Sequence, residues 1–448
     1  MVNAESEPLR GTSDRDAMKI CAITCVKDSH ELLAASIGHL ALNGIADFYL
    51  WDHGSDPSLA SMIASRFAPG AIRAKVLRKE TPAFFQGAMF RALTELARID
   101  GFDVAVGFDA DEFWCSTVPG QTLAEQIALE MSPGLDGLTV PVMNYVQHRD
   151  VETFRLESLK TARYFVVPQL DTAGSPGEMV DAGLPFVALP FPSKVVARVS
   201  GDTWFIEGQH GIVKTDGATS LACTSGVIVR HLSLPSRGDL VVKRDQGIRR
   251  VDAGFSPDIG WQLQRLAPMT EAGLDEYWNN NSWHLGADGR PVVGSYDRLE
   301  EDDALAVIAN GLANDHGIFA SDPQDPGPTM GKACVTEVSS RSFELVVESL
   351  VNDLGHSEVV RDGRLGEARR ALSERTAWAL ELELDVQRLG DRLVALQGEF
   401  DERTAWALQL DAGLQQRDRE LAAIKSSALW RAGKALHLEP RSGPARRT

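Results

Sequence analysis

Cysteine is scarce in this sequence of 448 residues, and its few copies are scattered. The total of five is odd, and only Cys21 and Cys25 lie close together. A structural zinc site needs about four ligands, usually supplied by two such close pairs, so the sequence predicts no site of this kind. We interpret the cysteines as reduced thiols of a protein inside the cell, where disulfides are rare.

Long apolar segments are also missing. No run approaches the roughly 18 apolar residues that a transmembrane helix requires. The N-terminal segment MVNAESEPLRGTSDRDAM has no apolar core of the kind that a signal peptide contains. These absences predict a cytoplasmic protein whose residues 1–17 are disordered.

Positive charge is in the minority, because 45 lysine and arginine residues stand against 63 aspartate and glutamate residues. The formal net charge is therefore −18 at pH 7. Binding of nucleic acid needs a basic surface that neutralises phosphates, so we predict no nucleic acid partner. A nucleotide ligand is still allowed, since one bound divalent cation can neutralise its phosphates.

What the sequence does contain, from residue 18 to about residue 110, is a regular alternation of apolar runs and helical patterns. Strands are expected at residues 20–26, 48–51, 72–77 and 104–108, and each of the first three is followed by a helix. Asp28 and Glu31 have the spacing of a capping box at the start of the first helix. The alternation predicts an α/β fold with a parallel sheet that helices cover on both faces.

After about residue 135 the pattern changes to strand-like runs. These runs lie at residues 138–142, 164–167, 194–199 and 226–230. They predict a mixed sheet that completes a domain spanning residues 18–319, with poor order in the Gly- and Pro-rich loop 171–192.

Acidic turns follow three of the expected strands, at Lys27-Asp28, at Asp52-His53-Gly54-Ser55 and at Asp109-Ala110-Asp111. Ligands of parallel sheets bind beyond the carboxyl ends of the strands, where these turns are expected. If the chain stays extended after the fourth strand, Asp109 and Asp111 point to the same side. Two such carboxylates suit a hard divalent cation that also contacts a diphosphate, although an isolated Asp-x-Asp triplet is often only a solvated turn.

The C-terminal part has a different organisation. Residues 320–340 read as a linker because Pro and Gly there cannot continue an element, and a helical region follows at residues 341–430. Apolar residues recur there at heptad spacing, in one stripe that includes Leu414 and Leu421 and a second that includes Leu410 and Ile424. The segment ERTAWAL occurs twice, four heptads apart. We predict an α-helical coiled coil that makes a homo-oligomer; the alternative is a single solvated helix.

The chain ends in a basic tail, residues 431–448. The segment 424–438 combines apolar residues at helical spacing with Lys425, Arg431, Lys434 and His437. It is predicted either to make a peripheral contact with the inner face of an anionic membrane or to be the frayed end of the coiled coil.

The acidic turns belong to a series of blocks in a fixed order. The blocks are Cys25-Val26-Lys27-Asp28, Tyr49-Leu50-Trp51-Asp52-His53-Gly54-Ser55-Asp56, Gln86, Phe108-Asp109-Ala110-Asp111-Glu112-Phe113, Lys194-Val195-Val196, Gly208-Gln209-His210-Gly211 and Arg230-His231-Leu232. This series, within residues 18–250, resembles the GT-A-fold glycosyltransferases, especially a bacterial family 2-like branch with a D-x-D-E-F block. Asp28 and His53 stand where that family commonly has asparagine, and both keep a hydrogen-bonding group.

The resemblance implies a metal-dependent glycosyltransferase that moves a sugar from a nucleotide-diphosphate sugar to an acceptor hydroxyl, with inversion, in bacterial surface glycan assembly. The acceptor would be a glycan or lipid-linked, and the cofactor would be Mn²⁺ or Mg²⁺. Asp111 would be a metal ligand and so take part in catalysis, Asp109 would face the metal or the ribose, and His231 would complete the metal shell. The residues implied to line the nucleotide-sugar pocket are Lys27, Asp28, Asp52, Gln86 and Asp109.

An inverting transfer also needs a general base, usually a carboxylate, to take the proton of the acceptor hydroxyl. Four carboxylates follow the metal block: Asp150, Asp181, Asp202 and Glu207. Glu207 is the candidate base because it precedes Gly208-Gln209-His210 directly. Trp204, Trp261 and the aromatic run 277–284 could either stack on an acceptor sugar or pack at the edge of the domain.

Two other functions share some of these features. A nucleotidyltransferase also uses two aspartates and a metal, but it normally has a Gly-rich, basic triphosphate loop near its first strand, which residues 24–28 do not supply. The second alternative is a non-catalytic scaffold, in which the transferase domain is degenerate and the coiled coil is the functional part.

Overall fold

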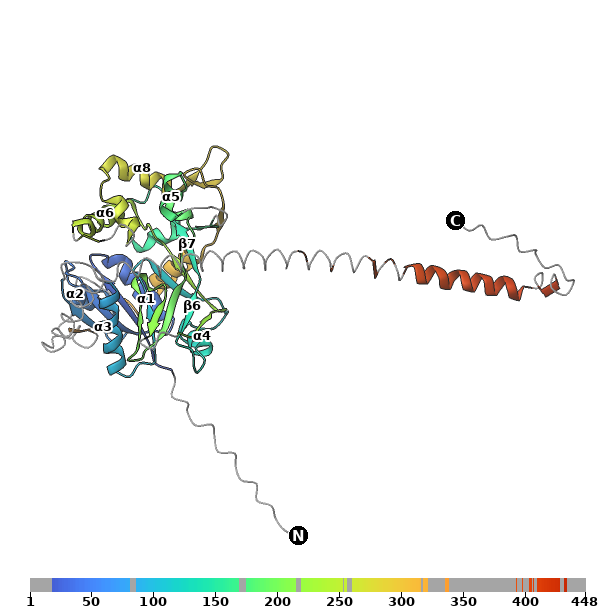
Figure 1. The fold of residues 1–448 in the computed structure, drawn as a ribbon, viewed down its shortest axis with the longest axis horizontal. Coiled ribbons are helices and arrows are strands. Elements are labelled where there is room, and N and C mark those ends of the chain that lie inside the picture. The colour runs from blue at the N-terminus through green and yellow to red at the C-terminus, as the bar shows by residue number, and fades with distance from the viewer. Residues whose placement is uncertain are drawn as a thin grey trace, which may run out of the picture. The chain divides into compact units, whose positions relative to one another are not determined.

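The structure is a computed structural model, and it divides the chain into two units, residues 1–360 and 361–448 (Figure 1). It describes residues 18–80, 86–168, 175–214, 219–252, 254–255, 260–315, 317–320 and 335–337 of the first unit. In the second unit it describes residues 392, 397, 403–404, 406, 409–427 and 431–432. The predictions for residues 1–17 lie outside this part of the chain.

The first unit begins with the expected alternation of strands and helices. The elements are β1 (Ile20–Val26), α1 (His30–Leu42), β2 (Asp47–Asp52), α2 (Leu59–Arg66), β3 (Arg73–Arg78), α3 (Gln86–Ile99) and β4 (Val104–Gly107). The four strands pair in parallel in the order β4-β1-β2-β3. Their bounds agree with the predicted ones to within one residue, so the predicted parallel sheet is confirmed.

Both faces of this sheet are buried, which explains why its strands are apolar along their whole length. In β1, Ile20, Ala22 and Val26 pack in one core cluster with residues of α1 and α2, whereas Cys21, Ile23 and Cys25 pack in another with residues of α3. The four cysteines within the described part of the chain are free thiols, as predicted.

The sheet becomes mixed on its other side. β9 (Lys194–Arg198) lies antiparallel between β4 and β6 (Gly137–Val140), and β12 (Leu221–Cys223) follows β6. At the opposite edge, β17 (Val335–Glu337) pairs in parallel with β3. The prediction that residues 320–340 are only a linker is therefore wrong for this segment, because the edge of β3 offers unpaired backbone groups that an added strand can satisfy.

Among the described residues, a second sheet has five strands. Its order is β16 (Leu299–Glu301), β8 (Tyr164–Val166), β7 (Val142–Val146), β13 (Val227–His231) and β5 (Glu112–Ser116). β13 is antiparallel to β5 and parallel to β7. Since only four residues, 108–111, lie between β4 and β5, this pairing places the end of β13 directly beside the Asp-x-Asp turn.

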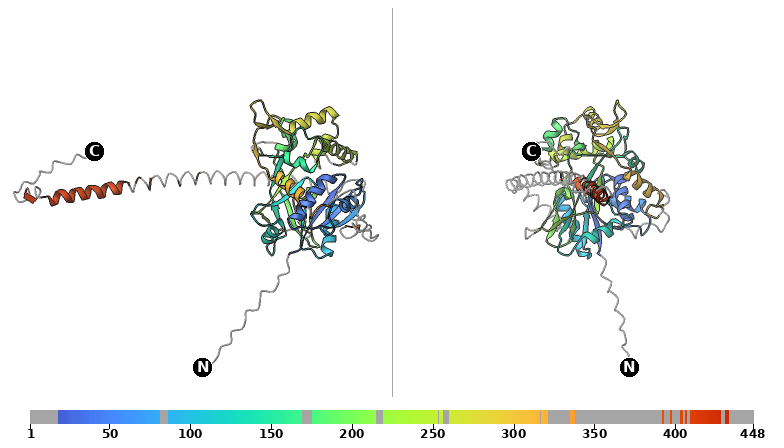
Figure 2. Two further views of the ribbon diagram at one scale, coloured as in Figure 1. Left: turned by 180° about the vertical axis from the view of Figure 1, so that it is seen from behind. Right: turned by 90° about the vertical axis from the view of Figure 1, so that its right-hand side faces the viewer.

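The remaining elements surround these sheets. They are α4 (Leu123–Glu130), η1 (Leu156–Thr161), α5 (Pro176–Asp181), η2 (Phe186–Ala188), β10 (Thr203–Phe205), η3 (Glu207–Gln209), β11 (Ile212–Lys214), α6 (Arg237–Asp252), α7 (Trp261–Leu266), α8 (Glu271–Asn281), β14 (Trp283–Leu285), β15 (Pro291–Val293) and α9 (Ala304–Asn314). α5, α6 and α8 lie together, away from α2, α3 and α4 (Figures 1 and 2).

Part of the loop 171–192 is ordered, contrary to prediction. α5 forms because Ser175 and Glu178 make a reciprocal capping box and Pro176 occupies the first turn. We missed this helix because its composition is that of a turn, whereas its capping residues favour a helix start.

The second unit contains a helix over residues 409–426. Leu410, Leu414, Leu421 and Ile424, which belong to the two predicted heptad stripes, are exposed on it. Most of the region 341–430, including most of the ERTAWAL repeat, and nearly all of the tail 431–448 lie outside the described residues. No helix in the described part of the chain is both long enough and apolar enough to cross a membrane.

Candidate active site

The loops that follow β1 and β2 are tied to each other. The backbone N–H of Asp28 donates to Ser55 Oγ over 3.1 Å, and Asp28 Oδ1 accepts from the backbone N–H of Asp56 over 3.0 Å. Asp28 has a left-handed backbone conformation, with φ 56°, and the residue that caps α1 is Ser29, without a side-chain hydrogen bond. The predicted capping box is therefore wrong, since the Asp28 carboxylate holds the neighbouring loop instead.

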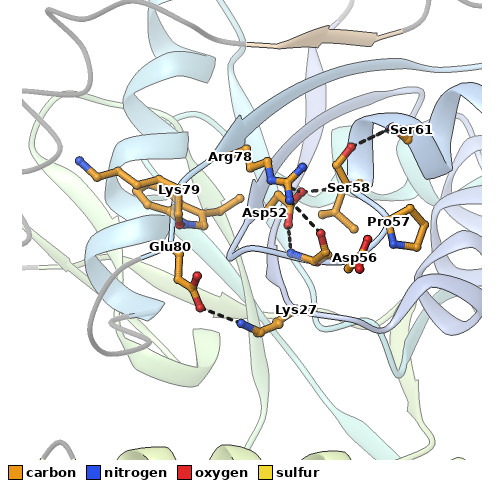
Figure 3. A network of polar contacts seen from close by, with 12 residues as sticks. Lys27, Asp52, Asp56, Pro57, Ser58, Ser61, Arg78, Lys79 and Glu80 are labelled. Carbon is orange, nitrogen blue, oxygen red and sulfur yellow. Dashed lines mark hydrogen bonds and ion pairs between the residues drawn. The ribbon is translucent and has the colours of Figure 1, made fainter.

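Asp52 is buried beneath the same loop and binds its backbone (Figure 3). Its side chain is fully buried at the end of β2, and its two oxygens accept from the backbone N–H groups of Ser55, over 2.7 Å, and of Leu59, over 3.0 Å. Asp52 thus fixes the turn and the start of α2. A role of Asp52 in a nucleotide pocket stays a prediction, and in the structure its carboxylate binds the backbone of this loop.

Lys27 lies at the side of this loop, where its Nζ is 2.9 Å from Glu80 Oε1 (Figure 3). The hydrogen bond and charge of Lys27 lower the pKa of Glu80, and weaker contributions come from His53 and from Arg249 at the end of α6.

Asp109 lies at the end of β4, between α3 and β9. Gln86 Nε2 donates to Asp109 Oδ1 over 3.0 Å, while Gln86 Oε1 accepts from the backbone N–H of Gly208 over 3.1 Å. Lys194 Nζ lies 2.8 Å from Asp109 Oδ2. The structure therefore brings together Gln86 and Asp109, which the resemblance assigned to one pocket. It adds Lys194 as a third member of this group.

Lys194 is a buried cation that contacts four acceptors around the turn. Besides Asp109, its Nζ lies 2.6 Å from Glu112 Oε1 and donates to the backbone oxygen of Gly208 over 2.8 Å and to Gln209 Oε1 over 3.1 Å. Burial works to lower the pKa of Lys194, but the carboxylates of Asp109 and Glu112 outweigh it and raise the pKa. Burial raises the pKa of Glu112 to about 7. Lys194 lies on a strand that the sequence predicts and in one of the blocks of the resemblance, but the sequence indicated no role for it, because the partners of its ammonium group lie far away in sequence.

Asp111 turns toward different partners. Its Oδ1 lies 3.6 Å from His231 Nε2, and its Oδ2 lies 3.3 Å from Lys243 Nζ on α6. Burial acts to raise the pKa of Asp111, but Lys243 and His231 hold it well below the ordinary value. His231 reaches this position because β13 pairs with β5, in a register that sets His231 opposite Glu112.

The two aspartates do not follow an extended chain. β4 ends at Gly107, and the backbone N–H of Glu112 donates to the oxygen of Asp109 over 3.1 Å, which closes a turn. The alternation argument for Asp109 and Asp111 is therefore wrong, because it assumed a strand where the chain turns. Glu112 Oε2 accepts from the backbone N–H of Asp109 over 3.2 Å and so supports this turn from the buried side.

The donor set at Asp111 suits one kind of metal site. Within the described ranges of the chain, no three His, Cys, Asp or Glu side chains converge in a way that would hold an ion. Asp111 Oδ1 and His231 Nε2, which are 3.6 Å apart, are close enough to share one ion at bond lengths of roughly 2.0–2.2 Å. Mg²⁺ and Mn²⁺ that bridge to a diphosphate are typically held by one or two protein groups, with phosphate oxygens and waters as the other ligands. The pair therefore fits an ion shared with a nucleotide, and the imidazole favours Mn²⁺.

The candidate bases lie in different surroundings. Glu207 is in η3, beside Gly208, and its Oε1 lies 3.2 Å from Arg250 Nη1. The other three candidates have different partners. Asp181 pairs with Arg265, and Asp202 accepts a hydrogen bond from Ser200. The side chain of Asp150 is 80% exposed.

The sequence reading missed a further carboxylate. Asp239 lies on α6 one turn before Lys243, accepts from Ser236 Oγ over 2.6 Å, and has a pKa that burial raises. Its four-residue spacing from Lys243, which puts both on one face of the helix, was the signal available for it.

For the tryptophans, stacking on an acceptor sugar and packing in the domain were the two alternatives. Trp278 is 3% exposed and Trp283 is 8% exposed, so the packing alternative holds for both. The ring of Trp204 has Arg91 above it, with the guanidinium carbon 4.3 Å from the ring centroid, and Trp261 contacts Phe186.

Comparison of the sequence with models of known protein families and with curated proteins gives no match. Function is therefore inferred from the geometry around Asp109, Asp111 and His231.

Proposed function

We propose that this chain is a metal-dependent glycosyltransferase with a GT-A-like catalytic domain. It transfers a sugar from a nucleotide-diphosphate sugar to an acceptor hydroxyl, with inversion, in the assembly of a bacterial surface glycan. The observation that carries this proposal is the contact between Asp111 and His231 at the carboxyl end of β4, beside the loops of β1 and β2. Ligands of open α/β sheets bind at this edge.

The residues around this edge have separate tasks in the proposed reaction. Asp111 and His231 would hold the Mn²⁺ or Mg²⁺ ion, which when bound neutralises charge on the departing nucleoside diphosphate. Lys194 and Gln86 fix Asp109 in one orientation toward the donor. The loop that Asp28 and Asp52 hold forms the wall of the nucleotide pocket.

The residue that removes the proton from the acceptor hydroxyl is chosen by comparing the surroundings of two carboxylates, Glu207 and Asp239. The carboxylate of Glu207 is engaged by Arg250, with Glu207 Oε1 3.2 Å from Arg250 Nη1. Burial favours the protonated form of Asp239, near Asp111 and Lys243. Asp239 is therefore the better candidate base of the two.

The second unit supplies self-association in this proposal. The exposed apolar residues at positions 410, 414, 421 and 424 occupy both predicted heptad stripes of one helix. An isolated helix leaves such a stripe in water, whereas a coiled coil with a second copy buries it. We therefore extend the proposal to a homo-oligomer formed through this helix.

A thermal-shift panel of nucleotide sugars, each with and without Mn²⁺, tests the proposed activity. One class of nucleotide sugar is expected to raise the Tm of the wild type only with Mn²⁺, since a ligand that binds the folded state stabilises it. Asp111→Asn should lose this rise, whereas Glu95→Gln, a change on the outer surface of α3, should keep it. Absence of any Mn²⁺-dependent rise, or release of pyrophosphate instead of a nucleoside diphosphate on turnover, would contradict the proposal.

A further inference from the structure

Arg149 follows β7 and is held in place by its backbone. Its backbone N–H donates to the oxygen of Trp283 over 3.1 Å, and its oxygen accepts from Trp278 Nε1 over 2.7 Å. Both tryptophans are buried, so the position of Arg149 is fixed by the packing of β14 and α8.

The guanidinium of Arg149 is poorly satisfied by comparison. Of its five N–H donors, one, on Nη2, has an acceptor among the described residues: His284 Nδ1, 2.7 Å away. Its Nε is buried and has no hydrogen-bond partner in the described part of the chain. No carboxylate of a described residue lies within ion-pair distance of it. A buried or partly buried cation of this kind is unfavourable unless an anion joins it.

Among the described residues, the surroundings of Arg149 add no carboxylate in contact with its guanidinium. Burial and the charge of Arg149 lower the pKa of His284, so its neutral ring accepts the Arg149 hydrogen bond. His148 lies against Trp283, with ring centroids 4.5 Å apart, and its Nδ1 is 3.7 Å from Asp150, whose side chain is 80% exposed. The cluster therefore consists of one arginine and two histidines with a single solvated carboxylate at its edge.

One strand of the second sheet, β13, separates β7, the strand before this cluster, from β5 and the Asp-x-Asp turn. His231 is paired with Asn144, and Arg149 is five residues further along, which is at most about 18 Å of chain.

The start of α6 connects the two places. The backbone N–H groups of Arg237 and Gly238 donate to the oxygens of Val151 and Glu152, just after Arg149. The same helix carries Asp239 and Lys243, and Lys243 contacts Asp111. A molecule that extends from Arg149 to Asp111, at the carboxyl ends of the parallel strands, therefore passes the start of α6.

We propose that Arg149, together with His284, binds an oxyanion of the acceptor, a phosphate or a carboxylate placed within two or so sugar units of the reacting hydroxyl. The assignment to an acceptor rests on the proposed glycosyltransferase activity; the oxyanion site itself does not. Arginine is suited to this role because its planar fork makes paired hydrogen bonds to phosphate and carboxylate groups. Acidic acceptors would thus be preferred over neutral ones of the same sugar sequence.

The site is tested first without any donor. The Tm of the wild type is measured with inorganic phosphate and, separately, with glucuronate, against sodium chloride of equal ionic strength. The variants are Arg149→Gln, Lys243→Gln, which removes a cation from the Asp111 edge, and Arg290→Gln, which changes an arginine that is 81% exposed. Phosphate or glucuronate is expected to raise the Tm of the wild type, Lys243→Gln and Arg290→Gln, but not of Arg149→Gln. Arg149→Gln should fold, with a Tm without ligand equal to or above that of the wild type.

The outcomes separate the parts of the proposal. A rise with phosphate alone assigns a phosphorylated acceptor, and a rise with glucuronate alone assigns one with an acidic sugar. No rise in the wild type, or a rise that persists in Arg149→Gln, overturns the site. In a transfer assay, Arg149→Gln should raise the KM for an acidic acceptor at least tenfold and leave the KM for the nucleotide sugar unchanged. If nucleotide sugars fail to bind while the Arg149-dependent rise is present, the glycosyltransferase proposal and the acceptor assignment fall, and the oxyanion site stands.

Discussion

The ammonium group of Lys194 lies 2.6 Å from the carboxylate of Glu112, and both side chains are almost completely buried. The same ammonium contacts Asp109, so a single cation on β9 pairs with the carboxylates at both ends of the turn 109–112. In a sheet interior this arrangement is stable only as a set, since each charge would be strongly unfavourable alone. The turn that carries the proposed active site thus depends on a strand far away in sequence.

Removing the cation should destabilise the fold. Lys194→Met leaves Glu112 buried without its partner and is expected to lower the free energy of unfolding by about 3–5 kcal/mol. The double variant Lys194→Met with Glu112→Gln should recover a large part of this loss, because the buried charge is then gone as well. Urea denaturation of the variants measures the effect. Lys160→Met, in an exposed pair with Glu157, is the matched control and should change stability by less than about 1 kcal/mol; an equal loss in both would refute the role of Lys194.

His39, on α1, gives the fold a defined dependence on pH. Burial lowers the pKa of His39 from 6.5 to about 4, and its Nε2 lies 2.9 Å from the backbone oxygen of Trp114. Between these two pKa values the unfolded chain binds a proton that the folded protein does not, so stability falls as the pH drops from about 6.5 to 4. The contribution of His39 between pH 7 and pH 5 is on the order of 2 kcal/mol.

Urea denaturation at pH 7 and at pH 5 tests this. His39→Gln should reduce the loss of stability between the two pH values, whereas His30→Gln, at the other end of the same helix, should leave the loss unchanged. If wild type and His39→Gln lose the same stability on acidification, the buried histidine is not responsible.

The first half of the fold was predictable because its signals are local. A strand buried on both faces is apolar at every position, as in Ile20–Val26, and the helices between the strands carry their own periodicity. The turn at Asp109 was not predictable in the same way. It depends on Glu112, whose side chain reaches back to the Asp109 backbone, and on a cation from β9.

The same limit applies to the partners of the site. His231 was identified by resemblance, but its contact with Asp111 depends on the antiparallel register of β13 and β5, which no local pattern encodes. Asp28 and Asp52 were expected as pocket residues, and the structure shows what their carboxylates bind: backbone N–H groups of one loop. Sequence alone located the edge of the sheet where these groups meet, and long-range pairing decides which atoms touch.

The two candidate bases are separated by substitution. Asp239→Asn is expected to lower kcat for transfer by about 100-fold or more, because general base catalysis contributes on the order of 10²–10⁴-fold. Glu207→Gln should have a smaller effect on kcat, since the carboxylate of Glu207 is already engaged in an ion pair with Arg250. Binding of the nucleotide sugar, followed by thermal shift, should be retained in both. A larger loss of kcat in Glu207→Gln than in Asp239→Asn would reverse the assignment.

Self-association through the second unit is tested on its exposed stripe. Leu414 and Leu421 lie seven residues apart in one stripe and are 58% and 49% exposed in a single chain. Replacing both with aspartate places charge in the proposed seam, so the double variant should elute with the mass of one chain in size-exclusion chromatography with light scattering, whereas the wild type should not. Gln416→Asp, which adds charge outside the two stripes, should leave the mass unchanged. Donor binding should persist in the dissociated variant, since the nucleotide loops belong entirely to the first unit. A wild type that already has the mass of one chain would contradict the coiled coil.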